Sequence, residues 1–206
     1  MSNAYLQSIN KKETNELLVS FVQYAEQNKV PIITYEGINF LTQVIKLRNI
    51  KSVLEVGTAI GYSSISLALK TGVRVTTIER DKEMFDLAQV NIKKAKVDHL
   101  VTSIFADALD VDETQLGTFD LVFIDAAKAQ SIKFFEKYET ILNEGGIIIT
   151  DNLLFHGLVD QTVKDRNLRQ LLTKIDRFNK FVVDKEGYDT FIYELGDGMS
   201  LSIKKE

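Results

Sequence analysis

Three side chains that carry oxygen donors follow short apolar runs in the sequence. Asp125 comes directly after the run at residues 121–124, and Asp151 and Asn152 follow the run at residues 147–149 after one threonine. Hard divalent cations such as Mg²⁺ bind oxygen ligands, and a chain with no cysteine and only two histidines serves a softer metal less well. Each acid alone could be a helix cap or a loop acid. Together the three predict a site for Mg²⁺, or for another oxygen-preferring cation such as Mn²⁺ or Ca²⁺.

Lys128 lies three residues after Asp125, at the start of an expected helix. An ordinary lysine is protonated at neutral pH, but a nearby cation and a helix N-terminus would both lower its pKa. We therefore expect Lys128 to act as a general base toward a hydroxyl group. The alternative is a lysine that only orients the substrate or pairs with an acid.

A glycine-containing segment at residues 55–61 follows another apolar run, with the spacing Gly-x-x-x-Gly. Glycine lets a ligand approach the backbone closely before a helix begins. Glu79 ends the next run, where an acid can hydrogen-bond the hydroxyls of an adenosine ribose. A tight turn without a ligand and a solvated acid beside Arg80 are the alternatives. Taken together, the loop and Glu79 predict an adenosine ligand.

Glu55 helps to choose between two candidate ligands that contain adenosine, NAD and S-adenosylmethionine. Its carboxylate would repel a pyrophosphate near Gly57, whereas it would tolerate an ammonium and a sulfonium. A dehydrogenase is further disfavoured because the spacing Gly-x-Gly-x-x-Gly is missing. Asp107 follows a later run and fits the adenine amino group as an acceptor, or alternatively caps a helix. These residues predict S-adenosylmethionine as the cofactor.

Apolar runs alternate with amphipathic stretches, and these elements must position the residues above. Unbroken apolar runs are typical of strands buried on both faces of a parallel sheet, whose ligands bind beyond the carboxyl ends of the strands. The expected strands contain residues 53–54, 73–78, 101–105, 121–124 and 147–149. The expected helices cover residues 16–27, 36–47, 63–70, 82–94 and 131–142. Residues 191–203 predict a hairpin, so the fold class is α/β, doubly wound, with an antiparallel end.

Length and composition limit the class of protein. A chain of 206 residues predicts a single domain, with residues 1–50 as a helical N-terminal cap and residues 51–206 as the core. There is no apolar run of about 18 residues, so we expect no membrane span. The first residues do not show a charged and then apolar pattern followed by a cleavage site, so we do not expect secretion. The net charge of −4 gives no global attraction to nucleic acid. These features are typical of a cytoplasmic globular protein.

Four segments jointly resemble the metal-dependent O-methyltransferases, a family that includes the catechol and caffeoyl-CoA enzymes. They are L-E-V-G-T-A-I-G-Y-S at 54–63, I-E-R at 78–80, F-I-D-A-A-K at 123–128 and T-D-N at 150–152. The resemblance covers nearly the whole chain. It implies a Rossmann-like methyltransferase fold with a mostly parallel seven-stranded sheet and extra N-terminal helices, and it suggests a homodimer.

The resemblance also implies a role for each matching position. It makes Asp125, Asp151 and Asn152 the metal ligands and Lys128 the catalytic base. Ile33, within residues 32–37, would close over cofactor and substrate. The residues that would hold the cofactor, from its methionine end to its adenine, are Glu55, Gly57, Ser63, Asp125, Glu79, Asp107 and Ala108.

Within the family, the chain is most similar to the bacterial enzymes that methylate 5-hydroxyuridine at the tRNA wobble position to 5-methoxyuridine. Residues 151–159 and 196–199 support this similarity. A catechol presents the same two adjacent oxygens, so a small catechol-like or caffeoyl-CoA-like acceptor is the alternative. A module that binds S-adenosylmethionine without catalysis is a third hypothesis, and the intact metal and base set argues against it.

Basic side chains before the hairpin bear on the choice between these acceptors. As a tRNA footprint they would neutralise phosphates, and a solvated helix face interleaved with Asp165 and Asp176 is the alternative. The cluster consists of Lys164, Arg166, Arg169, Lys174, Arg177 and Lys180, and Lys11, Lys12, Arg48 and Lys51 add charge near the start. His156 is close enough to the Asp-Asn pair to line the site, but we expect it to structure the loop.

Overall fold

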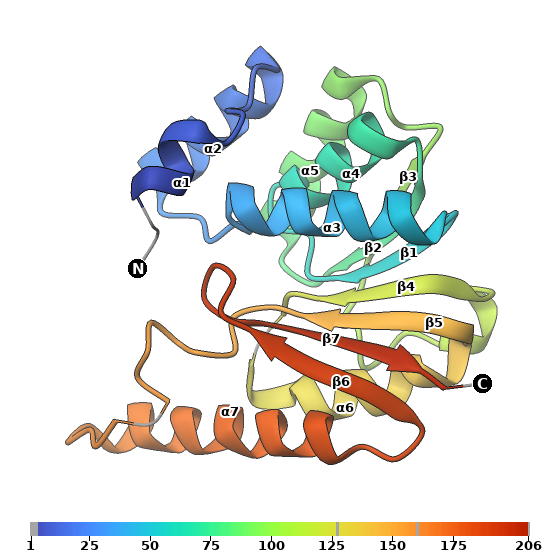
Figure 1. Ribbon diagram of the computed structural model, residues 1–206. Helices are drawn as coiled ribbons and strands as arrows, with labels where there is room; N and C mark the ends of the chain where they lie inside the picture. The colour runs from blue at the N-terminus through green and yellow to red at the C-terminus, as the bar shows by residue number, and fades with distance from the viewer. Residues whose placement is uncertain (1–3, 127, 160, 206) are drawn as a thin grey trace.

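The central feature of the structure is a seven-stranded sheet with helices on both faces (Figure 1). The computed structural model describes residues 4–126, 128–159 and 161–205. The strands are β1 (Ser52–Val56), β2 (Arg74–Glu79), β3 (Val101–Phe105), β4 (Phe119–Ile124), β5 (Leu142–Thr150), β6 (Tyr188–Tyr193) and β7 (Met199–Lys204). Their order is β3-β2-β1-β4-β5-β7-β6. The first five strands are parallel, and β7 pairs antiparallel with β5 and β6. The predicted parallel sheet with a terminal hairpin is therefore confirmed.

The sheet separates the core into two hydrophobic layers, and each layer is covered by helices. They are α1 (Ala4–Ile9), α2 (Glu16–Asn28), α3 (Tyr35–Arg48), α4 (Tyr62–Thr71), α5 (Lys82–Ala95), α6 (Ser131–Tyr138) and α7 (Arg166–Asp184), with short 3-10 helices η1 (Glu113–Gln115), η2 (Lys128–Gln130) and η3 (Glu139–Ile141). Neighbouring strand residues point to opposite faces. Val53 therefore packs in the cluster that includes α2 to α5, and Leu54 packs in the cluster that includes α6 and α7. Among the described helices, none is long and apolar enough to cross a membrane.

Local sequence signals set the helix starts near the site. The Thr34 hydroxyl accepts from the Gly37 amide and caps α3, and the Asp81 carboxylate caps α5 in the same way. Gly61 begins α4 with a φ of 81°, a conformation that glycine adopts without steric cost. Each of these caps follows a segment that reaches the carboxyl edge of the sheet, so the caps fix where the loops leave it.

Several element boundaries differ from the sequence prediction; β5, for example, begins at Leu142 rather than at residue 147. The helix expected at residues 131–142 ends at Tyr138, because Leu142 already pairs with Phe119 in the sheet. The basic cluster before the hairpin forms one long helix, α7. Its buried stripe, which packs against the sheet side, consists of Leu172, Ile175, Phe178 and Val182.

Candidate cofactor and metal site

The predicted site residues meet because three parallel strands end at the same edge of the sheet. Val56 of β1 pairs with Ile124 of β4, and Ile124 pairs with Thr150 of β5. The pairing continues one residue further, since the Asp125 amide donates to the Val56 carbonyl at 2.9 Å and the Asp151 amide donates to the Ile124 carbonyl at 3.1 Å. The structure thus brings the glycine loop and both aspartates into one row.

Of the three predicted metal ligands, Asn152 contacts both of the others. The Asn152 amide nitrogen Nδ2 donates to Asp125 Oδ1 at 2.9 Å, and the Asn152 backbone amide donates to Asp151 Oδ1 at 2.7 Å. Asp151 is buried, and Asn152 adopts a left-handed backbone with φ 62°. In the described part of the chain, no group of three or more His, Cys, Asp or Glu side chains is arranged to hold a metal ion. The metal site of Asp125, Asp151 and Asn152 therefore stays a prediction.

Lys128 begins η2, four positions after β4 ends at Ile124. Its side chain lies outside the described part of the structure. Its role as a base therefore stays a prediction.

The glycine loop after β1 is held against the ends of β2 and β4. Gly57 has a φ of 98°, and a Cβ added there would overlap the carbonyl oxygen of Asp125. Glu79 Oε2 accepts from the backbone amides of Thr58 at 3.0 Å and Ala59 at 2.9 Å, and its Oε1 accepts from the Asp81 amide at 2.8 Å. Glu79 therefore organises the loop as well as facing the cavity, a role that the sequence did not reveal.

Glu55 is fully buried beneath this loop, on the α4 side of the sheet. The Thr77 hydroxyl donates to Glu55 Oε2 at 2.6 Å and lies 2.6 Å from the Thr58 hydroxyl. Burial raises the pKa of Glu55 to about 7, hydrogen bonds from Ser63 and Thr77 oppose the rise, and the charges of Asp125 and Glu79 add to it. Cationic groups nearby would favour the ionised carboxylate.

A cavity of about 500 Å³ opens at the same edge of the sheet. It is lined by seven of the predicted cofactor residues and by the predicted metal ligand Asn152. These seven are Ile33, Gly57, Ser63, Glu79, Asp107, Ala108 and Asp125. Glu55 and Asp151 lie beneath the lining. The sequence did not single out Phe134, Phe155 or Asp197, which also line the cavity.

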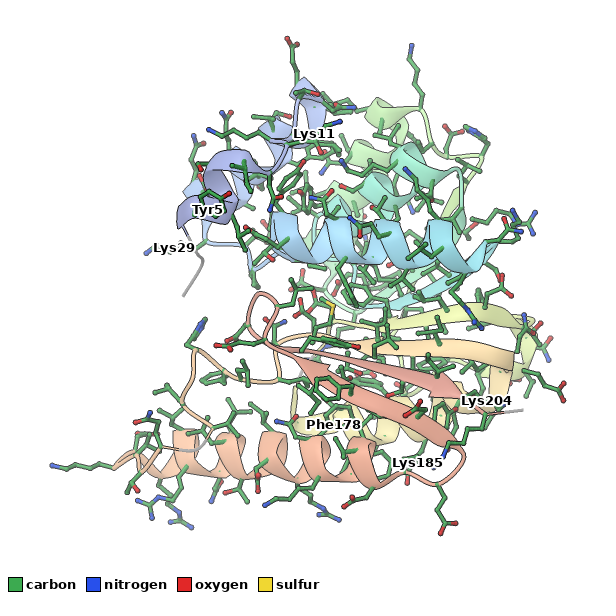
Figure 2. The ribbon with its side chains drawn as sticks, in the orientation of Figure 1. Tyr5, Lys11, Lys29, Phe178, Lys185 and Lys204 are labelled. Carbon is green, nitrogen blue, oxygen red and sulfur yellow. The ribbon has the colours of Figure 1, made fainter. Side chains whose placement is uncertain are left out.

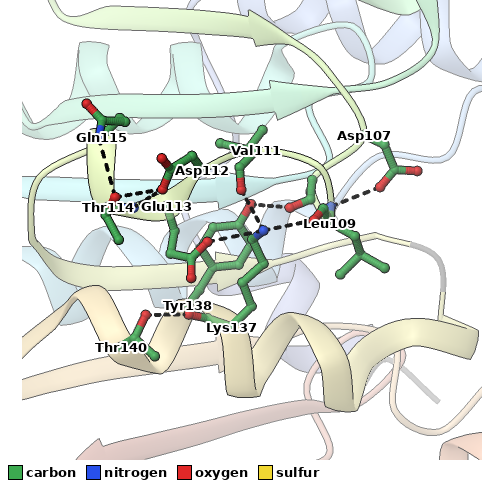
Figure 3. Close-up of polar contacts among 11 residues, drawn as sticks. Asp107, Leu109, Val111, Asp112, Glu113, Thr114, Gln115, Lys137, Tyr138 and Thr140 are labelled. Atoms are coloured by element: carbon green, nitrogen blue, oxygen red, sulfur yellow. Dashed lines mark hydrogen bonds and ion pairs between the residues drawn. The ribbon is translucent and has the colours of Figure 1, made fainter.

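The far end of the cavity is formed by the loop after β3, which α6 holds in place (Figure 3). Asp107 Oδ1 accepts from the Leu109 amide at 2.9 Å, and Asp107 Oδ2 lies 3.5 Å from the Arg80 guanidinium. The hydrogen bond from the Leu109 amide resembles a helix cap, which is the alternative role considered for Asp107. Here, however, the bond closes a turn and does not begin a helix. Lys137 Nζ donates to the Leu109 carbonyl at 2.8 Å, and the buried Tyr138 hydroxyl donates to the Ala108 carbonyl at 2.6 Å.

The mouth of the cavity is shaped by the segment after β5, which the turn between β6 and β7 clamps. The Leu154 amide donates to the Asp197 carbonyl at 2.7 Å, and the His156 amide donates to the Asp197 carboxylate. Phe155 and His156 both have positive φ, 47° and 58°, a conformation that costs energy for non-glycine residues. His156 both lines the cavity and takes part in this clamp.

Comparisons with known proteins agree with this geometry. A family model described as O-methyltransferase matches residues 7–205. A caffeoyl-CoA O-methyltransferase from Populus kitakamiensis is 32% identical over 189 residues, which cover 87% of this chain and 80% of that protein.

Two solved structures show how far the likeness extends in space. One is from Staphylococcus aureus and is named a "putative caffeoyl-CoA O-methyltransferase"; it is 38% identical, with a TM-score of 0.88, covering 98% of this chain and 96% of that one. The other is the O-methyltransferase TomG from Streptomyces achromogenes in complex with S-adenosylmethionine, which is 26% identical, with a TM-score of 0.82, covering 98% of this chain and 95% of that one.

Proposed function

We propose that this chain, which belongs to the O-methyltransferase family, transfers the methyl group of S-adenosylmethionine to a hydroxyl that has a second oxygen beside it. The observation that carries the proposal is the position of Asp125. This carboxylate lines the cofactor cavity and also accepts a hydrogen bond from Asn152. A single residue thus joins the expected cofactor site to the expected metal site.

The cavity suits S-adenosylmethionine in size and in the placement of its polar groups. A volume of about 500 Å³ lies within the usual range for a small-molecule site. Glu79 and Asp107 offer carboxylate acceptors for the ribose hydroxyls and the adenine amino group. At the other end, Asp125 offers a negative charge for the cofactor's ammonium. The S-adenosylmethionine complex of TomG supports the same cofactor here.

The donor set also suits a hard cation. Asp125, Asp151 and Asn152 would hold Mg²⁺, or Mn²⁺ or Ca²⁺, through oxygen atoms. Asn152 now donates through Nδ2 to Asp125, and a half-turn of its amide would present Oδ1 in the same place. When bound, the cation would supply Lewis acidity that favours the ionised form of an acceptor hydroxyl.

Methyl transfer then needs a proton acceptor and an aligned oxygen. We assign the proton to Lys128 Nζ. The hydroxyl oxygen forms a bond to the methyl carbon as the carbon–sulfur bond breaks, which leaves the methylated acceptor and S-adenosylhomocysteine. The cavity walls, including Ile33 and Phe155, limit water around the reacting atoms and hold the acceptor in line.

The acceptor that we favour is 5-hydroxyuridine at the tRNA wobble position, whose O4 and 5-hydroxyl are adjacent. The resemblance of residues 151–159 and 196–199 to the tRNA enzymes supports this choice. A tRNA acceptor would place the protein in the cytoplasm. A small catechol-like or caffeoyl-CoA-like acceptor is the second candidate, and the names of the relatives from Populus kitakamiensis and Staphylococcus aureus support it.

We also propose that the protein forms a homodimer. The hairpin strand β6 lies at the edge of the sheet and exposes aromatic side chains. The ring centroids of Phe191 and Tyr193 are 5.0 Å apart, and Phe40 of α3 lies 5.9 Å from Tyr193. An apolar cluster beside an unpaired strand edge suits self-association.

Mass spectrometry of tRNA from cells lacking the protein tests the acceptor. We expect 5-hydroxyuridine to accumulate at the wobble position and 5-methoxyuridine to disappear. Wild-type protein should restore the methylated base, whereas Asp125→Ala should not. Unchanged wobble modification would refute the tRNA acceptor and make the small catechol-like acceptor the first candidate.

A further inference from the structure

Helix α7 carries a basic stripe on the side opposite its buried face. The buried positions, such as Ile175 and Phe178, face the sheet. Four of the five basic residues of α7 are spaced three or four positions apart when Thr173 is counted between them, so these four share one side of the helix. Lys174 lies outside this series. We define the basic stripe as Arg166, Arg169, Arg177 and Lys180, all exposed.

Part of this charge is available for a partner. Lys180 pairs with Asp176 at 2.7 Å, and Arg169 donates to the carbonyls of Val163 at 3.3 Å and Lys164 at 3.2 Å. For Arg166 and Arg177, no ion pair is found among the described residues. Asp165 uses its carboxylate to cap the helix by accepting from the Leu168 amide. The positive end of the helix dipole adds to the charge at Arg166.

The helix also extends past the edge of the sheet where the cavity opens. Asn179 donates to the Leu153 carbonyl at 3.0 Å, so this part of α7 lies level with the segment that follows the metal ligands. The thirteen residue-to-residue steps from Arg166 to Asn179 cover about 20 Å at a rise of 1.5 Å per residue. Figure 1 shows this N-terminal part of α7 reaching beyond the strand ends.

We propose that the basic stripe of α7 binds the phosphate backbone of an RNA that carries the methyl acceptor. This inference rests on the proposed O-methyltransferase function. Three of its four side chains are arginine, whose planar guanidinium group fits a phosphate through two hydrogen bonds. The stripe from Arg166 to Lys180 is long enough to meet several consecutive phosphates. Because the whole chain has a net charge of −4, attraction to RNA must come from a local surface.

A membrane surface fits the same helix less well. An interfacial helix inserts its apolar face among the lipids, but the apolar face of α7 is buried against the sheet. Phe178, which Figure 2 labels on the sheet side of α7, is only 1% exposed, and Ile175 is 2% exposed. An RNA backbone, in contrast, would contact only the exposed outer face of α7.

The test is RNA binding by a variant with two fewer charges, Arg166→Gln combined with Arg177→Gln. The matched control is Lys93→Gln combined with Lys94→Gln, which removes two exposed charges from the last turn of α5. Binding of a fluorescent tRNA anticodon stem–loop is measured over a range of salt concentrations. We expect the α7 variant to bind about tenfold more weakly and its log–log salt slope to fall by about 0.7 for each lost contact. The control should match wild type.

A parallel assay with a small acceptor, a free catechol, separates the two proposals. We expect the α7 variant to methylate the catechol as fast as wild type does. The RNA-binding surface would be refuted, and the proposed function left standing, if the α7 variant bound RNA as well as wild type does. The same conclusion would follow if wild type methylated catechol but bound only phosphatidylglycerol vesicles. A wild type that binds RNA through the stripe yet methylates no acceptor would refute the proposed function and support the surface.

Discussion

Replacing Asp125 by alanine is expected to lower the rate of methyl transfer by about 1000-fold, which corresponds to about 4 kcal/mol of barrier. The substitution removes one of three oxygen ligands proposed for the cation, and Lewis-acid stabilisation contributes several kcal/mol. It also removes the negative charge that we propose Asp125 to offer to the cofactor in the cavity that it lines. The rate is measured with saturating S-adenosylmethionine and excess Mg²⁺.

The same substitution is expected to change activity far more than stability, because it relieves repulsion between acids while it removes the hydrogen bond from Asn152 Nδ2 to Asp125. Asp125, Glu55 and Glu79 are neighbouring acids, and the charges of Asp125 and Glu79 raise the pKa of buried Glu55. Removing one charge relieves this repulsion, as often happens when a functional residue is replaced. Asp98→Ala, an exposed acid outside the cavity, serves as the control and should keep full activity. A variant Asp125→Ala that retains more than about a tenth of the rate would contradict the assignment.

Gly57→Ala is expected to have the largest effect on stability among the glycines of the site. The backbone φ of 98° is unfavourable for alanine, and the new Cβ would overlap the Asp125 carbonyl oxygen. Because that oxygen belongs to the backbone, β1 and β4 would have to separate. We expect a loss of about 3 kcal/mol or more in the free energy of unfolding. Binding of S-adenosylmethionine should be lost as well.

Gly72→Ala provides a control with similar backbone strain and no collision. Gly72 ends α4 with a φ of 72°, and an added Cβ would have nothing within 4 Å in the described structure. Its cost should be about 1 kcal/mol, without an effect on the cofactor. Urea unfolding measures both stabilities, and calorimetric titration measures cofactor binding. Equal stabilities for the two variants would show that the close approach at Gly57 is relaxed in solution.

The parts of the site that follow from local patterns could be predicted from the sequence. Short apolar runs mark buried parallel strands, and the ends of such strands meet at one edge. This reasoning placed Gly57, Asp125 and Asp151 in neighbouring loops, and the backbone hydrogen bonds that continue past β1 and β4 confirm it.

Contacts between distant segments could not be predicted in the same way. The clamp between His156 and Asp197 joins residues 41 positions apart, and no periodic pattern reports such a pairing. The hydrogen bond from the Tyr138 hydroxyl to the Ala108 carbonyl could not be predicted for the same reason. Glu79 was singled out for the ribose, but its bonds to the Thr58 and Ala59 amides depend on how the glycine loop folds back on β2.

The most direct test of the central claim follows a labelled methyl group from S-adenosylmethionine in the presence of the purified protein. The acceptors are a catechol and tRNA that contains 5-hydroxyuridine, each with Mg²⁺ and then with excess EDTA. We predict that label appears on an acceptor oxygen with Mg²⁺ and that transfer stops with EDTA. Transfer that continues in EDTA would contradict the metal site. Cofactor binding that EDTA does not change, with no transfer to either acceptor, would contradict the enzyme and favour a binding module.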